Sequence, residues 1–346
     1  MRLLVPDEAT QFAGALFRAA GATGENARIV ANHLVQCSLM GLHSHGLMRV
    51  AQYLDGIEAG ETDPAAMPDV DFRHGAFVRL EGKRAFGQVG GAAAVEETVK
   101  LAAANGIAAA VVRRVGHAGR IGAYAQTLAE RGYVGVAFCS GPPSGHWVAP
   151  YGGLEGRTAT NPIAYALPAD PPIVADFSTS TVPEGVVRVL RDRGAETPPG
   201  VLQDAAGVPS TDPNLLYAVP PGTILPLGGE QFGYKGTALA LLVEAFATLL
   251  AGDDTDDRTR FGNNLAVLAL APDSGFGARA MRMADYVRSS RPADASRPVM
   301  IPGEPEQLRL ADADAVVVDE PTWQSLAALA RRHGLDPPRV TRVVDA

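Results

Sequence analysis

Hydrophobic residues recur at three- to four-residue spacing near both ends of the chain, which is the pattern of amphipathic helices. Over roughly the first 60 residues this spacing predicts three helices joined by short turns. The first helix is expected to begin at an N-cap provided by Asp7 and to end at Gly21. The second is expected to run out near Gly41, and the third to begin around Gly46. A final helix is expected within 320–340.

Between these ends the pattern changes to short apolar runs that alternate with longer helical repeats. Short apolar runs bounded by glycine and proline are typical of buried strands, so the middle of the chain predicts an α/β core. The expected helices are 90–105, 119–131 and 236–250, and the expected strands are 77–82, 107–115, 134–140, 163–168, 172–177 and 264–272. The acidic run 253–257 (DDTDD) is expected to be a solvated loop.

Composition narrows the class of protein. The chain has 346 residues, 47% hydrophobic and 20% charged, which is a globular balance and enough length for about two domains. Its net charge of −8 and its low aromatic content of 6% argue against a nucleic-acid partner. The longest apolar stretch, 237–251, contains Glu244 and is too short to span a bilayer, so we expect no membrane partner.

The N-terminal residues resemble neither a signal peptide nor a transit peptide, which predicts a cytoplasmic protein. Cys37 and Cys139 are far apart in sequence and show no CxxC spacing. In that compartment we expect both to be reduced thiols rather than a disulfide.

The segment 41–49 (GLHSHGLMR) contains the first residues suited to chemistry. If a helix opens here, His45 and Arg49 lie one turn apart on one face. An Arg can hold a carboxylate through two hydrogen bonds, a neighbouring His can transfer a proton, and Ser44 can orient the His. The alternative is that His43 and His45 only cap the end of a helix. Two histidines at this spacing are weak evidence for a metal, and we expect none.

Glycine-rich turns form a second group. In 116–122 (GHAGRIG) the glycines let backbone approach a phosphate at a helix start, and Arg120 adds a donor. The alternative is a tight strand-to-helix turn. No GxGxxG motif occurs anywhere, so a doubly wound dinucleotide fold lacks its usual signature.

Three further positions follow the same logic. Asp176, at the end of a predicted strand, has a carboxylate able to accept ribose hydroxyls or to cap the next turn. Lys235 is expected at a helix start, where it suits either an anionic partner or solvent. The segment 301–306 is expected to be a turn.

Taken together, the segments resemble the type-2 malate/L-lactate dehydrogenase family of NAD(P)-dependent oxidoreductases. The matching segments are 41–60, 115–132, 149–168, 174–180, 204–213, 225–244 and 301–304. The resemblance implies an α/β fold without a Rossmann domain. A helical domain built from both chain ends (1–75 joined by 278–346) would pair with a cofactor-binding domain (76–277) that has a mostly antiparallel sheet. It also implies a homodimer with the active site near the subunit interface.

The family's activity implies hydride transfer between NAD or NADP and C2 of a small 2-oxo or 2-hydroxy acid, a carboxylate substrate. The alternative within the family is reduction of a cyclic imino acid. By position, His45 resembles the proton donor with Ser44 as its partner, and His117 resembles a proton acceptor in some members. Substrate contacts are implied for Arg49 and Thr160, and cofactor contacts for His117, Gly119, Arg120, Asp176, Phe177, Ser178, Lys235, Pro302, Gly303 and Glu304.

One position departs from the family pattern. After the strand that contains Asp176, the family usually has Gly followed by Lys, Glu or Asp, where this chain has Gly185 and Val186. The loss of that polar group leaves open a third alternative, a catalytically impaired relative that keeps the cofactor pocket.

Overall fold

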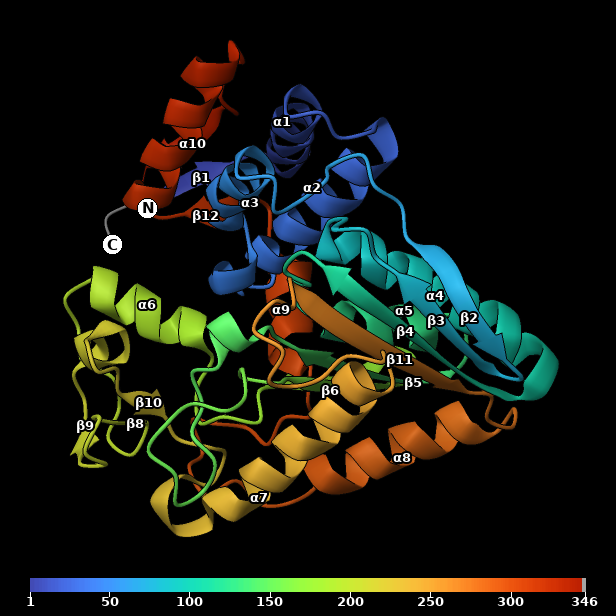
Figure 1. The fold of residues 1–346 in the computed structure, drawn as a ribbon. Coiled ribbons are helices and arrows are strands. Elements are labelled where there is room, and N and C mark those ends of the chain that lie inside the picture. The colour runs from blue at the N-terminus through green and yellow to red at the C-terminus, as the bar shows by residue number, and fades with distance from the viewer. Residues whose placement is uncertain (344–346) are drawn as a thin grey trace.

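A seven-stranded mixed sheet forms the centre of the computed structural model, which describes residues 1–343 (Figure 1). The strand order is β2-β3-β4-β11-β5-β6-β7, and every neighbouring pair is antiparallel except β3 with β4. The strands are β2 (Asp69–His74), β3 (Phe77–Glu81), β4 (Ile107–Val115), β5 (Val134–Ser140), β6 (Ile163–Leu167), β7 (Ile173–Phe177) and β11 (Asn263–Leu270). The mostly antiparallel sheet confirms the expected α/β class without a parallel Rossmann sheet.

Helices cover both faces of this sheet, because successive strand side chains point to opposite sides. On one face, α4 (Gly87–Asn105) and α5 (Gly122–Glu130) pack on an apolar cluster that includes Ala110 and Val112. On the other face, α7 (Gly229–Val243) and a π-helical segment, η4 (Glu244–Leu249), pack on a cluster that includes Val111. Burial on both faces explains why the central strands are almost continuously apolar.

A second layer joins the two ends of the chain. Here α1 (Pro6–Ala19), α2 (Gly24–Leu39), α3 (Arg49–Glu58) and α10 (Glu320–His333) surround a separate apolar core. A small sheet ties the ends together in the order β12-β1-β13, with bounds β1 (Arg2–Leu4), β12 (Val316–Val318) and β13 (Val340–Val343). In Figure 1, β1 and β12 lie between α10 and α3.

The remaining elements complete the fold, and α6 and α9 contribute residues to the site described below. They are α6 (Glu184–Asp192), α8 (Phe276–Arg288), α9 (Glu304–Asp312), and a second small sheet of β8 (Leu202–Gln203), β9 (Pro209–Ser210) and β10 (Thr223–Ile224). Short 3-10 turns occur at η1 (His43–His45), η2 (Pro143–Gly145) and η3 (Pro213–Tyr217).

The structure confirms most of the predicted elements and corrects several boundaries. The strands predicted at 107–115 and 134–140 have those bounds. The prediction for Asp7 is wrong: Pro6 opens α1, Val5 is the N-cap residue, and Asp7 lies in the first turn. The C-terminal helix stops at His333, where Gly334 adopts a left-handed conformation.

Both cysteines are free and buried, in agreement with the prediction of reduced thiols. Burial raises the pKa of Cys37 and of Cys139 to about 12, so both stay protonated and unreactive at neutral pH.

Candidate functional site

Two cavities lie side by side where the chain-end layer meets the edge of the central sheet. The first has a volume of about 750 Å³ and the second about 480 Å³. Ser44, His45 and Thr160 line both of them. His45 therefore stands at the boundary between two ligand-sized spaces, which is where a group that acts between two bound molecules belongs.

His45 and Arg49 reach the second cavity from different elements, so the prediction that they share a helix face is wrong. His45 ends the 3-10 turn η1, and α3 begins only at Arg49. The reason lies in α2: Ser38 Oγ accepts the backbone N–H of Leu47 at 3.0 Å. A Cβ on Gly46 would lie 2.2 Å from that oxygen, so the chain passes against α2 in an extended conformation before the helix can start.

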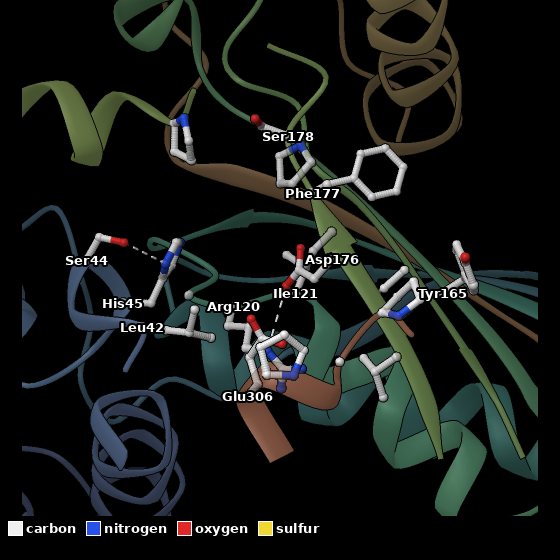
Figure 2. Close-up of a pocket in the computed structure, with 18 of the residues that line it drawn as sticks. Leu42, Ser44, His45, Arg120, Ile121, Tyr165, Asp176, Phe177, Ser178 and Glu306 are labelled. Atoms are coloured by element: carbon white, nitrogen blue, oxygen red, sulfur yellow. Dashed lines mark hydrogen bonds and ion pairs between the residues drawn. The ribbon is translucent and has the colours of Figure 1, made fainter. Parts of the chain in front are cut away.

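His45 is held as a neutral imidazole. Its Nδ1 lies 3.2 Å from Ser44 Oγ (Figure 2), which agrees with the predicted pairing of these two residues. Burial, with the nearby charges of Arg49 and Arg120, lowers the pKa of His45 to about 4. At neutral pH the ring can therefore accept a proton, and it can donate one only where its surroundings raise that pKa.

Arg49 is a buried cation whose guanidinium is held by neutral hydrogen-bond acceptors. It is 6% exposed, its Nε donates to the backbone oxygen of Ser44 at 2.6 Å, and Nη1 donates to Gln52. Among the residues that the structure describes, no carboxylate lies within 4.0 Å of it. Gly185 lies beside its free edge, where a Cβ would be 3.1 Å from Nη2. A buried guanidinium of this kind is suited to a carboxylate ligand.

His117 joins the same cavity from the end of β4. Its ring is stacked beside that of His45, with centroids 5.8 Å apart and planes inclined by 21°. Tyr53 Oη lies 2.8 Å from His117 Nδ1, and Gln88 Nε2 donates to Tyr53 Oη at 2.8 Å. Burial, with Arg49 and His45 nearby, lowers the pKa of His117 well below its ordinary value. Tyr53 was not among the predicted site residues, although its position four residues after Arg49 was a signal for the site.

The turn 116–122 connects β4 to α5 and lines the first cavity. Gly119 has φ of +70°, and a Cβ there would lie 2.4 Å from His33 Nε2. The Arg120 backbone N–H donates to that same His33 nitrogen at 3.0 Å. The turn is thus the tight strand-to-helix turn considered for this segment, and it also brings Gly119 and Arg120 to the cavity wall. Burial lowers the pKa of His33 to about 3, which keeps this nitrogen an acceptor.

Asp176, the penultimate residue of β7, lies on the opposite side of the first cavity from His45 (Figure 2). Its Oδ2 accepts the Gly122 backbone N–H at 2.7 Å, at the start of α5, and lies 4.0 Å from Arg120 Nε. Burial raises its pKa, while Arg120 and the Gly122 N–H oppose that rise. Phe177 and Ser178 follow along the same wall, and Ser178 Oγ donates to the Ser180 carbonyl at 3.0 Å.

The turn at 301–303 closes the first cavity and leads into α9, so the prediction of a turn over 301–306 is wrong for residues 304–306, which are helical. Pro302, Gly303 and Glu306 line the cavity, whereas Glu304 points away and pairs with Arg288. Gly303 has φ of +88°, and a Cβ there would lie 2.7 Å from the Val174 oxygen. Only glycine therefore permits this close approach of the turn to β7. Together with the turn at Gly119, it leaves a cavity within the usual size range for small-molecule sites.

Two of the predicted cofactor residues, Lys235 and Glu304, line neither cavity. The prediction that Lys235 starts a helix is wrong, because α7 begins earlier, at Gly229. Its ammonium group instead lies 5.1 Å from the Phe232 ring centroid and 5.9 Å from that of Tyr234.

Two arginines that sequence reasoning missed, Arg188 and Arg260, line the second cavity. Arg188 is neutralised by Glu184 at 2.7 Å. Arg260 is 5% exposed and its Nη1 donates to Thr248 Oγ1 at 2.8 Å. Nothing local marks either residue, because each reaches the cavity only through the path of the surrounding chain.

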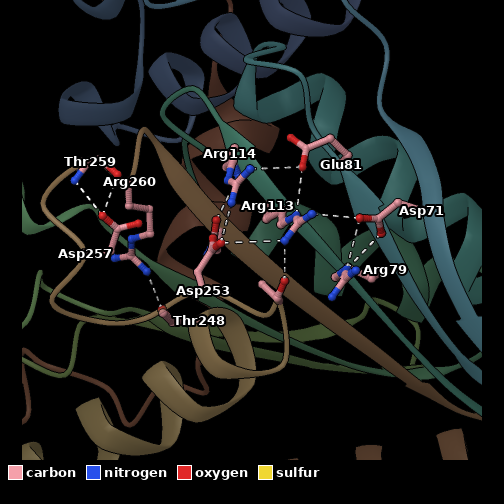
Figure 3. Close-up of polar contacts among 12 residues, drawn as sticks. Asp71, Arg79, Glu81, Arg113, Arg114, Thr248, Asp253, Asp257, Thr259 and Arg260 are labelled. Atoms are coloured by element: carbon pink, nitrogen blue, oxygen red, sulfur yellow. Dashed lines mark hydrogen bonds and ion pairs between the residues drawn. The ribbon is translucent and has the colours of Figure 1, made fainter.

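The loop that carries Arg260 is anchored by a charged network (Figure 3). Asp253 Oδ1 lies 3.1 Å from Arg114 Nη2, and Asp253 Oδ2 accepts from Asn264 Nδ2 at 2.9 Å. Asp253 is 8% exposed, so the prediction of a solvated acidic loop is wrong at this residue. The network holds the loop against β4 and β11 and thereby positions Arg260.

Among residues 1–343, no helix is long and apolar enough to cross a membrane. The same part of the chain contains no group of three or more His, Cys, Asp or Glu side chains placed to hold a metal ion.

Comparison with known proteins identifies the family. Residues 4–327 match the family model described as malate/L-lactate dehydrogenase. The chain is 32% identical to hydroxycarboxylate dehydrogenase B of Escherichia coli, with 94% of this chain and 92% of the relative covered. It is 33% identical to a Δ1-pyrroline-2-carboxylate reductase of Burkholderia multivorans, over 68% of this chain and 67% of the relative. The crystal structure of a dehydrogenase from Sinorhizobium meliloti matches with a TM-score of 0.85 and 31% identity, over 95% of this chain and 98% of that one. The chain therefore belongs to the malate/L-lactate dehydrogenase family of enzymes.

Proposed function

We propose that this enzyme reduces a small 2-oxo acid, and oxidises the matching 2-hydroxy acid, with NAD or NADP as the hydride carrier. The observation that supports this most directly is the buried Arg49, which has no carboxylate within 4.0 Å among residues 1–343 and lines the same cavity as His45. A 2-oxo acid carries a carboxylate for the first group and, on the adjacent carbon, an oxygen that needs a proton from the second.

In this proposal Arg49 and His45 act together through their charges. Arg49 is, after burial, the largest cause of the lowered pKa of His45. A substrate carboxylate on Arg49 offsets that positive charge, so binding raises the pKa of His45 toward its ordinary value. His45 thus gains a proton when an anionic substrate is in place, and it donates that proton to the C2 oxygen. Ser44 Oγ orients the ring through Nδ1.

The first cavity is the proposed cofactor site. The residues proposed to hold the nucleotide are Gly119, Arg120, Asp176, Phe177, Ser178, Pro302 and Gly303, all of which line it, and Thr160 lies where the two cavities meet. When bound, the nicotinamide supplies or takes the hydride at C2. Val186 also lines this cavity, at the position where the family usually has a polar residue.

A cyclic imino acid is the second substrate class, favoured by the 33% identity to the Burkholderia multivorans reductase. Such a substrate also carries a carboxylate beside the carbon that receives the hydride, so Arg49 would serve it in the same way. The two classes differ in the atom that receives the proton, which is oxygen in one and nitrogen in the other.

A substrate panel tests the proposal. Pyruvate, oxaloacetate, longer 2-oxo acids and Δ1-piperideine-2-carboxylate are each offered with NADH and with NADPH, and the nicotinamide absorbance is followed. Turnover of at least one 2-oxo acid above the imino acid is the expected result. Preference for the imino acid would support the second class, and cofactor fluorescence changes without any turnover would contradict both and indicate an impaired relative.

The division of the chain into two domains at about residues 75 and 278 remains a prediction. We also propose a homodimer whose interface is built on α7. Phe232, Tyr234, Leu241 and Leu249 are each more than 50% exposed along α7 and η4, and several large apolar side chains exposed along one helix typically mark an interface. Lys235, on the same helix, would then reach a site only across that interface. Light scattering should give twice the 36.0 kDa chain mass, and a monomer at micromolar concentration would contradict the proposal.

A further inference from the structure

A buried chain of hydrogen bonds leads from α4 through α3 to His117. Gln88 Nε2 donates to Tyr53 Oη, and Tyr53 Oη lies on His117 Nδ1, each at 2.8 Å. Gln88 is 1% exposed and Tyr53 is 6% exposed, so water does not compete for these groups. None of the groups in this series of hydrogen bonds takes part in the proton transfer assigned above to His45.

The order of donors and acceptors in these hydrogen bonds determines which nitrogen of His117 carries a hydrogen. A phenol has one hydrogen to donate. Tyr53 Oη receives the Gln88 N–H, and among residues 1–343 its only other hydrogen-bond partner is His117 Nδ1. We therefore assign the phenol hydrogen to that bond, with Nδ1 as an unprotonated acceptor. A neutral imidazole with a bare Nδ1 carries its hydrogen on Nε2. Burial and the positive charge of Arg49 keep the ring neutral.

The remaining nitrogen is the one available to a ligand. Within residues 1–343, His117 Nε2 makes no hydrogen bond, and His117 lines the second cavity together with Arg49 and His45. With Nδ1 occupied by Tyr53, an Nε2–H group is left as the only polar contact that this ring can offer there.

We propose that Gln88 and Tyr53 are positioning residues that hold His117 as the Nε2–H tautomer, so that His117 donates a hydrogen bond to the substrate while His45 transfers the proton. This inference rests on the proposed function for the identity of the substrate group that His117 contacts. That group is the C2 oxygen of a 2-oxo acid, or the carboxylate beside the imino group of a cyclic imino acid. The two adjacent imidazoles then have different roles: His117 is a fixed hydrogen-bond donor that polarises the substrate, and His45 is the ring that changes protonation.

Nitrogen NMR of the ligand-free protein tests the tautomer without any substrate. The protein is labelled with ¹⁵N-histidine, and the signals of His117 are identified by their loss in His117→Gln. The expected spectrum has an unprotonated Nδ1 and a protonated Nε2, and Tyr53→Phe is expected to convert it toward a mixture of tautomers. A protonated Nδ1 in the wild type, or an unchanged spectrum in Tyr53→Phe, would overturn the proposal.

Kinetics test the consequence. Tyr53→Phe and Gln88→Leu are expected to lower kcat about five- to tenfold, the effect of weakening one hydrogen bond, with KM changed by less than about twofold. Thr98→Val is the matched control, because Thr98 is also buried on α4 but its hydroxyl only donates to the Ala94 oxygen at 2.8 Å. Its kcat should equal that of the wild type, and an equal loss there would show a merely structural effect and overturn the proposal.

The two experiments separate this inference from the proposed function. The expected tautomer in a protein that turns over no member of the substrate panel would leave the positioning chain intact and contradict the proposed function. Turnover together with a protonated Nδ1 would do the reverse.

Discussion

His45→Ala is expected to lower kcat by about 10²- to 10⁴-fold for whichever acid the substrate panel identifies, the usual loss when a positioned proton donor is removed. The physical reason is that His45 is the titratable group that lines both cavities, and the carboxylate of a bound substrate beside Arg49 raises its lowered pKa. Steady-state rates measured with saturating cofactor and substrate give the value of kcat directly.

The pH dependence gives an independent signature of the same residue. Because the pKa of His45 in the free protein is lowered to about 4, its protonated fraction falls about tenfold for each pH unit above that value. For reduction, which needs the protonated ring, kcat/KM is therefore expected to fall as the pH rises. For oxidation, which needs the neutral ring, kcat/KM is expected to be level above about pH 5 and to fall below about pH 4.

The neighbouring His43 provides the control. It lies in the same 3-10 turn but lines neither of the two cavities, so His43→Ala should keep both the rate and the pH profile. Wild-type turnover in His45→Ala, or an unchanged pH slope in that variant, would contradict the assignment of the proton donor.

Arg49→Ala is expected to raise KM for the acid by about 10- to 100-fold, which corresponds to the loss of charge-assisted hydrogen bonds in a buried site. Binding isotherms for the substrate should weaken by a similar factor, while affinity for the cofactor in the first cavity stays unchanged. Arg49→Lys keeps the charge but loses the planar fork, so its KM should lie between those of the wild type and Arg49→Ala.

Arg28→Ala is a suitable control for this series, because Arg28 is an exposed arginine on α2 that pairs with Glu25 at 2.7 Å. It should leave KM unchanged. A KM for Arg49→Ala equal to that of the wild type would exclude the proposed carboxylate contact, whatever the effect on kcat.

Much of the fold could be predicted from local pattern alone, because burial leaves a periodic trace in the sequence. The central strands β4 and β5 are buried on both faces, so they read as nearly continuous apolar runs with clear ends. The strands β1, β12 and β13 could not be predicted, because they are three to four residues long. Their pairing joins Arg2 to Val318 and Val343, and no local window contains that information.

The residues of the site were largely identifiable in the sequence, but their arrangement was not. The motif 41–49 and the glycine turns already contained His45, Arg49 and Gly119. Only the tertiary structure decides that α3 starts as late as Arg49. The contact responsible joins Ser38 on α2 to Gly46 and Leu47 in the segment before α3. The tertiary structure likewise decides that Lys235 lies inside α7 and away from both cavities.

The amino-acid pattern alone was sufficient for the class of fold, the order of its central elements and the chemical types in the site. Each of these depends on side-chain identity and on short-range periodicity. The tertiary structure alone decided that Tyr53 joins Gln88 to His117, and that the buried Arg49 has no carboxylate within 4.0 Å in the described part of the chain. The two hydrogen bonds join residues that are 35 and 64 positions apart, where packing of whole elements rather than local preference fixes which groups meet.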